Sequence, residues 1–373
     1  MGAYMFDKNE VNTGRQPELD ICKGIVAFLL ATIHVYVECS TSEQLFHGLP
    51  YFFDSIVGGP WAAPMFIFAM GIGLAYTRKS SPGELAKRGA GLILVGFGLN
   101  VCRYLLPSLV GYAITGDRQM YLDRLPYLFF GNDLLQFAAL GMLFMALLKR
   151  FDLSPLKIWF VALAVNLVAT FFRGVFFSNM ALNIFLGHFI GVDDGTEIVM
   201  ADFPLFIWFL FYASGYLAGQ YLRRLKDKKK FYLMVSPVCL VLVTVIYIIQ
   251  YEMGFGMMGG EGNNVFYHMT TIEVFLCIAT MIGMLGVYYL ILPYLPKQVM
   301  GLMEFLSRNV TVIYCIQWTL VWWACDVFVY IIRGDKYLPS WQQLILGLCL
   351  SFATAALAQV WSKFKADRKQ KGK

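Results

Sequence analysis

Residues Leu19 to Cys39 read L-D-I-C-K-G-I-V-A-F-L-L-A-T-I-H-V-Y-V-E-C, and this stretch decides the fold. A helix that crosses the hydrocarbon core of a bilayer needs about 20 mainly apolar residues, which is the length of this run. A signal-peptide core is shorter and ends at a small-residue cleavage site, and neither property fits here. We therefore interpret the run as an uncleaved first membrane span that follows the polar residues 1–18.

Further apolar runs of spanning length follow the first one along the chain. Because lipid offers the backbone no hydrogen-bond partners, runs of this length are predicted to be helices. The sequence thus predicts an all-α polytopic bundle of about ten transmembrane helices. The predicted spans are 19–39, 56–77, 89–111, 133–148, 156–176, 203–222, 231–251, 269–292, 305–330 and 340–361. We expect one membrane domain over residues 1–373, made of an N-terminal segment 1–18, the bundle 19–361 and a basic tail 362–373.

The composition excludes an ordinary soluble protein. Hydrophobic residues make up 58% of the chain and charged residues only 14%, whereas a soluble domain carries about 25% charged residues. Aromatic residues reach 16%, which suits lipid-facing surfaces and interfacial belts. The short segments between the predicted spans leave no room for a large soluble domain.

The lysines and arginines give the orientation in the membrane. If the N-terminus is cytoplasmic, 24 of these 30 residues fall in segments on the cytoplasmic side. Membrane proteins concentrate Lys and Arg in their cytoplasmic loops, so we expect both termini in the cytoplasm. The same placement explains the formal net charge of +6 without a nucleic-acid partner, because basic inner loops face anionic lipid headgroups. We expect the lipid bilayer as a partner and no nucleic acid.

Neither the eight cysteines nor the four histidines form a recognisable disulfide or metal pattern. No two cysteines have C-x-x-C spacing, and most lie in apolar runs, which is typical of buried thiols that pack as small hydrophobic groups. No two histidines have H-x-x-x-H spacing. We therefore expect no metal cofactor.

His34 is an ionisable residue inside the first predicted span. Such residues are costly in lipid and are often functional. His34 lies 11 residues after Lys23, which is about 16 Å along a helix and close to the membrane midplane. A neutral imidazole there can act as a general base while a partner orients its second nitrogen. The alternative is a histidine that only packs and forms hydrogen bonds within the bundle.

Charged residues also mark the cytoplasmic ends of the first and ninth spans. Asp20 and Lys23 are three residues apart, and Glu304 and Arg308 are four apart, so each pair can meet on one helix face. An arginine at this depth can bind a phosphate group, and Asn309 follows it directly. Each pair can equally be a plain interfacial ion pair.

Polar residues continue toward the outer half of the bundle. Tyr314 and Gln317 share one face of the ninth span and can point into one cavity. An outer set of polar residues suggests a vestibule for a hydroxylated or amino acceptor, although each member taken alone is most simply a solvated residue. This outer set comprises His47, Asp54, Arg103, Arg124, Asp133, Gln136, Arg173, His188, Asp202, His268, Glu273 and Asp326.

Five stretches, in order along the chain, carry a resemblance to a known family. They are R-Q-P-E-L-D-I-C-K-G-I-V-A-F-L-L-A-T-I-H (15–34), G-G-P-W-A-A-P-M-F-I-F-A-M-G-I-G-L-A (58–75), N-D-L-L-Q-F-A-A-L-G (132–141), D-F-P-L-F-I-W-F-L-F-Y-A-S-G-Y-L-A-G (202–219) and S-R-N-V-T-V-I-Y-C-I-Q-W (307–318). In this order they resemble helices of the transmembrane acyltransferase superfamily. The resemblance is closest to its heparan-α-glucosaminide N-acetyltransferase-like branch, which is related to the membrane acyltransferase-3 proteins.

The first stretch follows the family's opening motif, approximately S-L-D-x-L-R-G and then a span that reaches His or Asn. The matching positions are Leu19, Asp20, Lys23, Gly24 and His34. Lys23 replaces the usual Arg, and Gln317 in the last stretch stands where many relatives have His.

The resemblance implies a transmembrane acyl-CoA-dependent O- or N-acyltransferase. Its acyl donor would be a cytoplasmic acyl-CoA, with acetyl-CoA favoured, and its acceptor an extracytoplasmic glycan, sugar or small molecule. His34 would be the general base in a ternary complex or, less economically, would form an acyl-imidazole, and His47 or Asp133 would assist. The residues expected to hold the CoA are Lys23, Arg308, Asn309, Tyr314 and Gln317.

Two other function classes stay open. A transporter or flippase would line its path with His34, Glu273 and Arg173 and would move substrate without acyl-CoA. A non-catalytic scaffold would bind acyl-CoA or lipid and release no free CoA. The short loops favour a bacterial cytoplasmic (inner) membrane over an organelle, and the aromatic-rich helices leave a homodimer open.

Overall fold

The computed structural model describes residues 5–192, 201–252 and 264–371. Helices supply the regular structure of these ranges, in which only three isolated bridges pair extended backbone. The all-α membrane fold is therefore confirmed for the described residues. Residues 1–4 of the predicted N-terminal segment, 193–200 and 253–263 of the predicted bundle, and 372–373 of the predicted tail lie outside them.

Seven helical stretches among the described residues are long and apolar enough to cross a bilayer. They are Pro17–Cys39, Pro82–Thr115, Leu205–Arg223, Lys228–Gln250, Thr271–Tyr294, Val310–Arg333 and Ser340–Arg368. The other three predicted spans coincide with shorter helices, namely α3 (Ala63–Tyr76), α8 (Leu134–Arg150) and α9 (Pro155–Phe171). The total of about ten spans and the cytoplasmic position of both termini stay predictions.

The internal contacts divide the chain into two compact units, and each is described by itself. Unit 1 comprises Met1–Glu18, Ala63–Gly98 and Pro126–Pro293. Unit 2 comprises Leu19–Ala62, Leu99–Leu125 and Tyr294–Lys373.

Unit 1 is built around close packing between α3 and α11 (Leu205–Arg223). A Cβ on Gly71 of α3 would meet the backbone of Tyr212, and a Cβ on Gly215 of α11 would meet the backbone of Phe68. Small residues let helix backbones approach each other in lipid, where the hydrophobic effect does not drive helices together. The other helices of unit 1 are α4 (Pro82–Asn100) up to Gly98, α7 (Leu125–Phe130) from Pro126, α8, α9, α10 (Met180–Gly187), α12 (Lys228–Glu252), α13 (Asn264–Tyr267) and α14 (Thr271–Ile291).

The N-terminal segment of unit 1 is held against the basic loop between α11 and α12. The Asp7 backbone N–H donates to the Arg224 carbonyl at 2.8 Å. Glu18 is fully buried and pairs with the Lys228 amine at 2.5 Å, and the Tyr232 hydroxyl donates to the same carboxylate oxygen at 3.2 Å. A buried carboxylate is tolerated because a cation and a hydrogen bond compensate its charge.

Unit 2 contains three long helices and one short amphipathic helix. The long ones are α1 (Pro17–Cys39) from Leu19 onward, α16 (Val310–Trp322) and α18 (Ser340–Lys371), and the short one is α15 (Lys297–Arg308). Helix α18 continues well past the predicted end of the last span, so the basic tail is helical as far as it is described. The smaller elements are η2 (Gln44–Phe46), α2 (Gly48–Tyr51), α5 (Leu106–Thr115), α6 (Arg118–Tyr121), η5 (Leu292–Tyr294, from Tyr294), α17 (Tyr330–Arg333) and the π-helical η3 (Phe52–Val57), η4 (Val101–Leu105) and η6 (Trp323–Val329).

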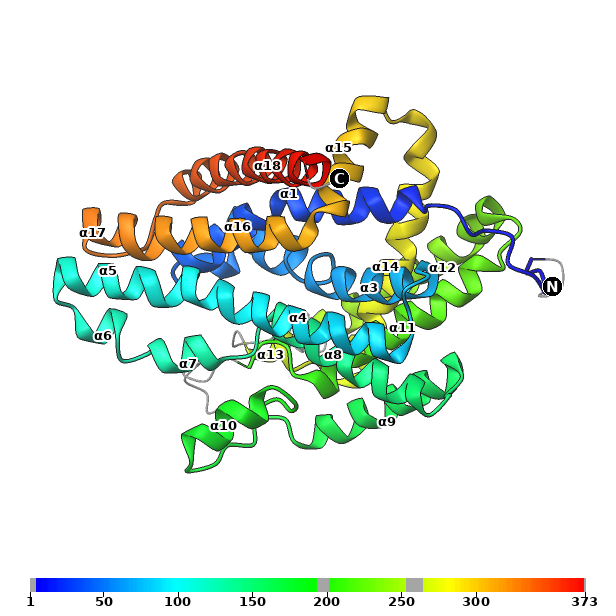
Figure 1. Ribbon diagram of the computed structural model, residues 1–373, viewed down its shortest axis with the longest axis horizontal. Coiled ribbons are helices and arrows are strands. Elements are labelled where there is room, and N and C mark those ends of the chain that lie inside the picture. Colours follow the sequence, from blue (N-terminus) through cyan, green and yellow to red (C-terminus); the bar gives the residue numbers. More distant parts are fainter. Residues whose placement is uncertain (1–4, 193–200, 253–263, 372–373) are drawn as a thin grey trace. The chain divides into compact units, whose positions relative to one another are not determined.

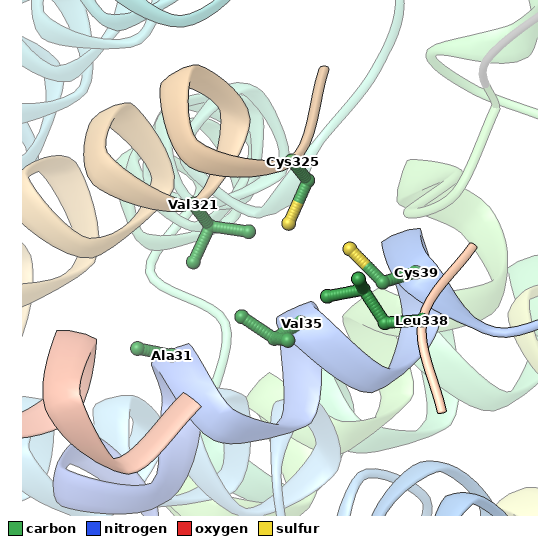
Figure 2. Packing of buried hydrophobic residues seen from close by; sticks show 6 residues of the cluster. All are labelled: Ala31, Val35, Cys39, Val321, Cys325 and Leu338. Atoms are coloured by element: carbon green, nitrogen blue, oxygen red, sulfur yellow. The ribbon is translucent and has the colours of Figure 1, made fainter. Parts of the chain in front are cut away.

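Helix α1 lies beside the helical stretch formed by α16 and η6, and both run in the same direction. At the start of α1, the Ser307 hydroxyl donates to Asp20 Oδ1 at 2.6 Å. At the other end, a buried hydrophobic cluster joins α1 to α16 and η6. Figure 2 shows the sulfur atoms of Cys39 and Cys325 pointing into the space between these elements. The cluster comprises Ala31, Val35, Cys39, Val321, Cys325 and Leu338.

Helix α18 runs antiparallel to α1 and α16. The Ser40 hydroxyl, just beyond the end of α1, donates to Gln343 Oε1 at 3.1 Å, and the hydroxyls of Thr32 and Ser351 lie 3.1 Å apart. Figure 1 shows α16 and α18, in orange and red, side by side over much of their length. These three helices form the frame that positions the polar groups of unit 2.

Candidate functional site

His34 and Gln317 meet where α1 crosses the middle of α16. His34 Nδ1 lies 2.8 Å from Gln317 Oε1, and Gln317 Nε2 donates to the Tyr314 carbonyl at 3.2 Å, which fixes the orientation of the amide. An amide oxygen can only accept a hydrogen bond, so Nδ1 of His34 carries the hydrogen. Nε2 is then the basic nitrogen of the imidazole, as a general base requires.

Trp318 and Arg103 extend this site. The Trp318 ring stacks on the His34 imidazole, with ring centroids 3.7 Å apart and an interplanar angle of 18°. The guanidinium carbon of Arg103 lies 5.1 Å from the centroid of the Trp318 ring and 4.3 Å from that of Tyr104. A guanidinium over aromatic faces is attracted by the ring quadrupoles. Imidazole, indole and guanidinium thus lie next to one another.

A π-helical turn places Arg103 in this position. Arg103 lies in η4, and its Nε and Nη2 atoms donate to Oδ1 of Asn100 at 3.2 and 3.0 Å. Both side chains are buried, with exposed fractions of 1% and 0%. The simple interpretation of Arg103 as a solvated outer residue is therefore wrong. π-Helical turns often occur at functional sites. A buried charge in a membrane span is also costly enough to suggest a function.

A groove of about 490 Å³ lies on the side of unit 2 where α15 ends and α18 passes over it. It is lined by Gly301, Glu304, Phe305, Arg308, Asn309, Ser362, Lys365 and Ala366. Two of the residues predicted to hold a CoA, Arg308 and Asn309, therefore line one groove. The sequence does not single out Ser362 and Lys365, which both fall in the predicted basic tail 362–373.

The groove contacts leave Arg308 available to an anion. Arg308 Nη2 lies 2.6 Å from Glu304 Oε1, but the Arg308 side chain is 63% exposed, so this ion pair contributes little stability. Asn309 ties the walls together, because its Nδ2 donates to the Phe305 carbonyl at 2.8 Å and its Oδ1 accepts from the Ser362 hydroxyl at 3.1 Å. An arginine fork beside a lysine is the chemistry that binds phosphate groups.

Helix α16 begins at the groove and carries Gln317 farther along. Asn309 lines the groove between α15 and α16, and Gln317 follows it by eight residues, which corresponds to about 12 Å along α16. The Ser307–Asp20 hydrogen bond lies at the groove end of this distance, and Lys23 is partly buried one turn farther along α1. The groove and the imidazole are therefore separated by about two turns of α16.

A charged cluster lies beyond His34 at the other end of α1. Lys336 Nζ lies 3.1 Å from Glu38 Oε2 and 3.7 Å from Asp326 Oδ1. Burial alone would lower the pKa of Lys336, but the carboxylates of Glu38 and Asp326 raise it above its usual value. Glu38 follows His34 by four residues, so the charged cluster begins one turn farther along the same face of α1.

The other predicted site residues have local roles. His47 is exposed on the turn between η2 and α2 of unit 2. Asp133 belongs to unit 1, where it is buried and caps α8 by accepting from the Leu134 N–H at 2.6 Å. Glu273, also in unit 1, forms a capping box with Thr270 at the start of α14. Arg173 lies in the turn after α9 of unit 1 and is partly buried. Among the described residues, no group of three or more His, Cys, Asp and Glu side chains could hold a metal ion.

Comparisons with known proteins give one match. A family model described as an Acyltransferase domain matches residues 16–360. No curated protein and no solved structure matches the chain. The matched region contains both His34 and Gln317 and ends just before Ser362 and Lys365, so the α18 wall of the groove lies beyond it.

Proposed function

The chain belongs to the Acyltransferase domain family, and on that premise we propose that it transfers an acyl group from a cytoplasmic acyl-CoA across the membrane. The acceptor is a hydroxyl or amine of an extracytoplasmic sugar or a similar molecule. Acetyl is the acyl group favoured by the resemblance to the glucosaminide acetyltransferase-like branch. A bacterial inner membrane is the proposed location.

One observation carries the proposal, namely the hydrogen bond between His34 Nδ1 and Gln317 Oε1. It selects Nε2 of His34 as the base that takes the proton of the acceptor hydroxyl or amine. The acceptor atom then forms a bond to the thioester carbonyl carbon. The tetrahedral intermediate collapses with cleavage of the carbon–sulfur bond, and the proton passes from His34 to the CoA thiolate. Free CoA and the acylated acceptor leave, and His34 returns to its neutral form.

The groove supplies the acyl-CoA site in this proposal. Arg308 and Lys365 bind the phosphates of CoA, and Ser362 and Asn309 hold the two walls of the groove together. The pantetheine arm then follows α16 over about 12 Å to the imidazole. Lys23, Tyr314 and Gln317 line the way, as the family resemblance implies. The assisting roles of His47 and Asp133 stay predictions.

Calorimetric titration of the detergent-purified protein with acetyl-CoA tests the acyl donor. We expect saturable binding that weakens in Arg308→Ala. The matched control is Arg333→Ala, because Arg333 also pairs with a nearby carboxylate but lies at the far end of the stretch Val310–Arg333. Equal weakening in both variants, or no binding of acetyl-CoA and longer acyl-CoAs, would contradict the acyl donor and favour transport.

Release of free CoA in the presence of candidate acceptors tests the base. With an acceptor that supports turnover, His34→Ala should lose activity by about 10²–10⁴-fold, the usual contribution of general base catalysis. The same variant should still bind acetyl-CoA, since the groove lies about 12 Å away along α16. Nearly complete activity in His34→Ala would remove His34 from the catalytic role.

A further inference from the structure

The indole N–H of Trp318 is a buried hydrogen-bond donor that no described residue accepts. The side chain is 92% buried, since its exposed fraction is 8%, and its Nε1 atom is fully covered. Leaving a buried N–H without an acceptor costs about 1–3 kcal/mol. Unpaired groups of this kind are rare in native proteins, and each one calls for an explanation.

Other tryptophans of the chain avoid this cost. The indole of Trp159 donates to the Ser214 hydroxyl at 2.9 Å, and that of Trp323 donates to the Cys102 carbonyl at 3.0 Å. The indole of Trp208 donates to the Tyr267 carbonyl at 2.8 Å. Trp318 is thus unusual among tryptophans of the same chain, and it is the tryptophan that stacks on His34.

The neighbours of Trp318 indicate which acceptor is missing. The stacked imidazole keeps the indole within 3.7 Å, centroid to centroid, of the proposed base, and the Arg103 guanidinium lies 5.1 Å from the ring. A group with developing negative charge that accepts from this N–H would therefore lie near both the proposed base and a positive charge. Acyl transfer generates such a group, because the thioester carbonyl oxygen becomes an oxyanion when the acceptor attacks.

We propose that Trp318 is a further catalytic residue, whose Nε1–H donates to the carbonyl oxygen of the bound acyl group and holds the oxyanion. This role rests on the proposed acyltransferase function. When the acceptor attacks, the carbonyl π electrons move onto the oxygen, and the Trp318 N–H and the positive field of Arg103 stabilise the charge. The electrons return when the carbon–sulfur bond breaks. A donor in a dry site is effective because no water competes for it and it needs no reorganisation.

The fully covered Nε1 atom has a direct consequence for binding. Side chains over it must move aside when the acyl group arrives, so its hydrogen-bonding state changes from unpaired to paired. The indole N–H signal of Trp318 therefore reports acyl-group binding, whether or not an acceptor is present.

The first test is magnetic resonance of the ¹⁵N-tryptophan-labelled protein with an acetyl-CoA analogue in which a methylene replaces the thioester sulfur. This ketone keeps the carbonyl oxygen and cannot transfer its acyl group. The Trp318 signal is assigned by its loss in Trp318→Phe. We expect a downfield shift of this signal on saturation, while the signal of Trp323 stays in place. Saturable analogue binding without a change at Trp318 would overturn the proposal and leave the acyl-CoA site standing.

The second test separates the N–H from the ring. Trp318 is replaced by benzothienylalanine, in which sulfur stands in place of the indole N–H and the stacked bicycle is kept. We expect a kcat about 10²–10³-fold lower, as for removal of one oxyanion donor, with KM and the pH profile little changed. Thermal stability should stay equal or rise, because an unpaired buried donor is removed. The same replacement at Trp323 should lower stability, because a satisfied hydrogen bond is lost, and should leave kcat near its normal value.

The outcomes distinguish two failures. If the wild-type protein neither binds the ketone analogue nor releases CoA, the proposed function fails and the role of Trp318 falls with it. If the wild-type protein turns over and benzothienylalanine at position 318 leaves kcat unchanged, only the role of Trp318 is overturned. A lower stability with a shifted pH profile would assign Trp318 to the packing of His34 and would also overturn it.

Discussion

The Nδ1 atom of His34 and the Oε1 atom of Gln317 lie 2.8 Å apart, although 283 residues separate them in the sequence. Helix α1 also contacts α15, the helix that directly precedes α16, because the Ser307 hydroxyl at the end of α15 donates to Asp20 at the start of α1. The orientation of the imidazole is therefore set by the packing of α1 against α16. Gln317 is fully buried, so it can be changed without altering an exposed surface.

Changes at Gln317 should act through His34. Gln317→Leu removes the acceptor of the Nδ1–H bond and should lower activity by about 10–100-fold, as loss of an orienting partner usually does. Gln317→Glu places a carboxylate there and stabilises the protonated imidazole, so the rise of activity with pH should move to higher pH. The measurement is kcat as a function of pH for both variants. Gln342→Glu on α18 is the control, and an unmoved profile in Gln317→Glu would show that residue 317 does not act on the base.

Lys365 should bind a phosphate of CoA. We expect Lys365→Ala to weaken binding of acetyl-CoA, measured by calorimetry, while Lys363→Ala leaves it unchanged because Lys363 does not line the groove. If Lys365 binds the 3′-phosphate, the wild-type protein should bind 3′-dephospho-acetyl-CoA as weakly as the Lys365→Ala variant binds acetyl-CoA. The variant should then lose no further affinity when the dephospho ligand replaces acetyl-CoA. Full additivity of the two changes would assign Lys365 to another part of the ligand or to none.

Gly24 permits the close approach of α1 to α15. A Cβ on Gly24 would lie 2.8 Å from Met303 Cα and 2.9 Å from its carbonyl oxygen, so backbone would have to move. We expect Gly24→Ala to destabilise the protein by about 1–3 kcal/mol, the usual cost of overpacking. The control is Gly73→Ala on α3, where a Cβ meets nothing within 4 Å, and the added helix propensity should stabilise by about 0.5–1 kcal/mol. Thermal unfolding in detergent compares the two variants. Equal stabilities would mean that α15 moves away from α1 without loss of stability.

The apolar runs predict the seven long apolar helical stretches, because lipid leaves a long apolar segment no other way to satisfy its backbone. The first run, 19–39, differs from α1 (Pro17–Cys39) only at its start. The length of α18 was not predictable in this way. Its last three turns are rich in Lys and Arg, so their low hydropathy predicts a tail, although Lys and Arg form helices readily once a helix has begun.

The sequence predicts individual residues of the site but not the contacts between them. His34 and Gln317 were both singled out, but hydropathy gives no information on which helices meet, so their hydrogen bond was not foreseen. Arg103 belongs to the predicted outer polar set, because the sequence pattern does not show the π-helical turn that carries it. The π-helical turn η4 adds a residue to that turn and changes the face on which Arg103 lies. An Arg three residues after an Asn in an apolar run is a signal that could have identified the pair.

The Glu18–Lys228 pair should be important for the stability of unit 1. Lys228→Ala leaves the fully buried Glu18 carboxylate without its cation, and loss of one partner of a buried pair costs about 3–5 kcal/mol. Glu18→Gln in the same background removes the uncompensated charge and should recover part of this loss. Lys229→Ala, at an exposed neighbour, is the control. Thermal unfolding of the four proteins tests the pair, and a double variant no more stable than Lys228→Ala would contradict its role.

The ion pairs of Lys336 with Glu38 and Asp326 should stabilise unit 2 equally at pH 8 and pH 9. The pKa of Lys336 is raised above its usual value, because the two carboxylates outweigh the opposing effect of burial. A group whose pKa is higher in the folded state contributes all of its stability below its unfolded pKa of about 10.4. The contribution of Lys336 is lost only when the pH rises through its folded pKa, so the lysine contributes equally at pH 8 and pH 9. Lys336→Met should therefore lower the unfolding temperature by the same amount at both values, with a cost near the lower end of about 3–5 kcal/mol because the lysine is 26% exposed. Glu38→Gln together with Lys336→Met should cost less than the sum of the single changes. A loss in Lys336→Met that grows or shrinks between the two pH values would mean that another group titrates in this cluster.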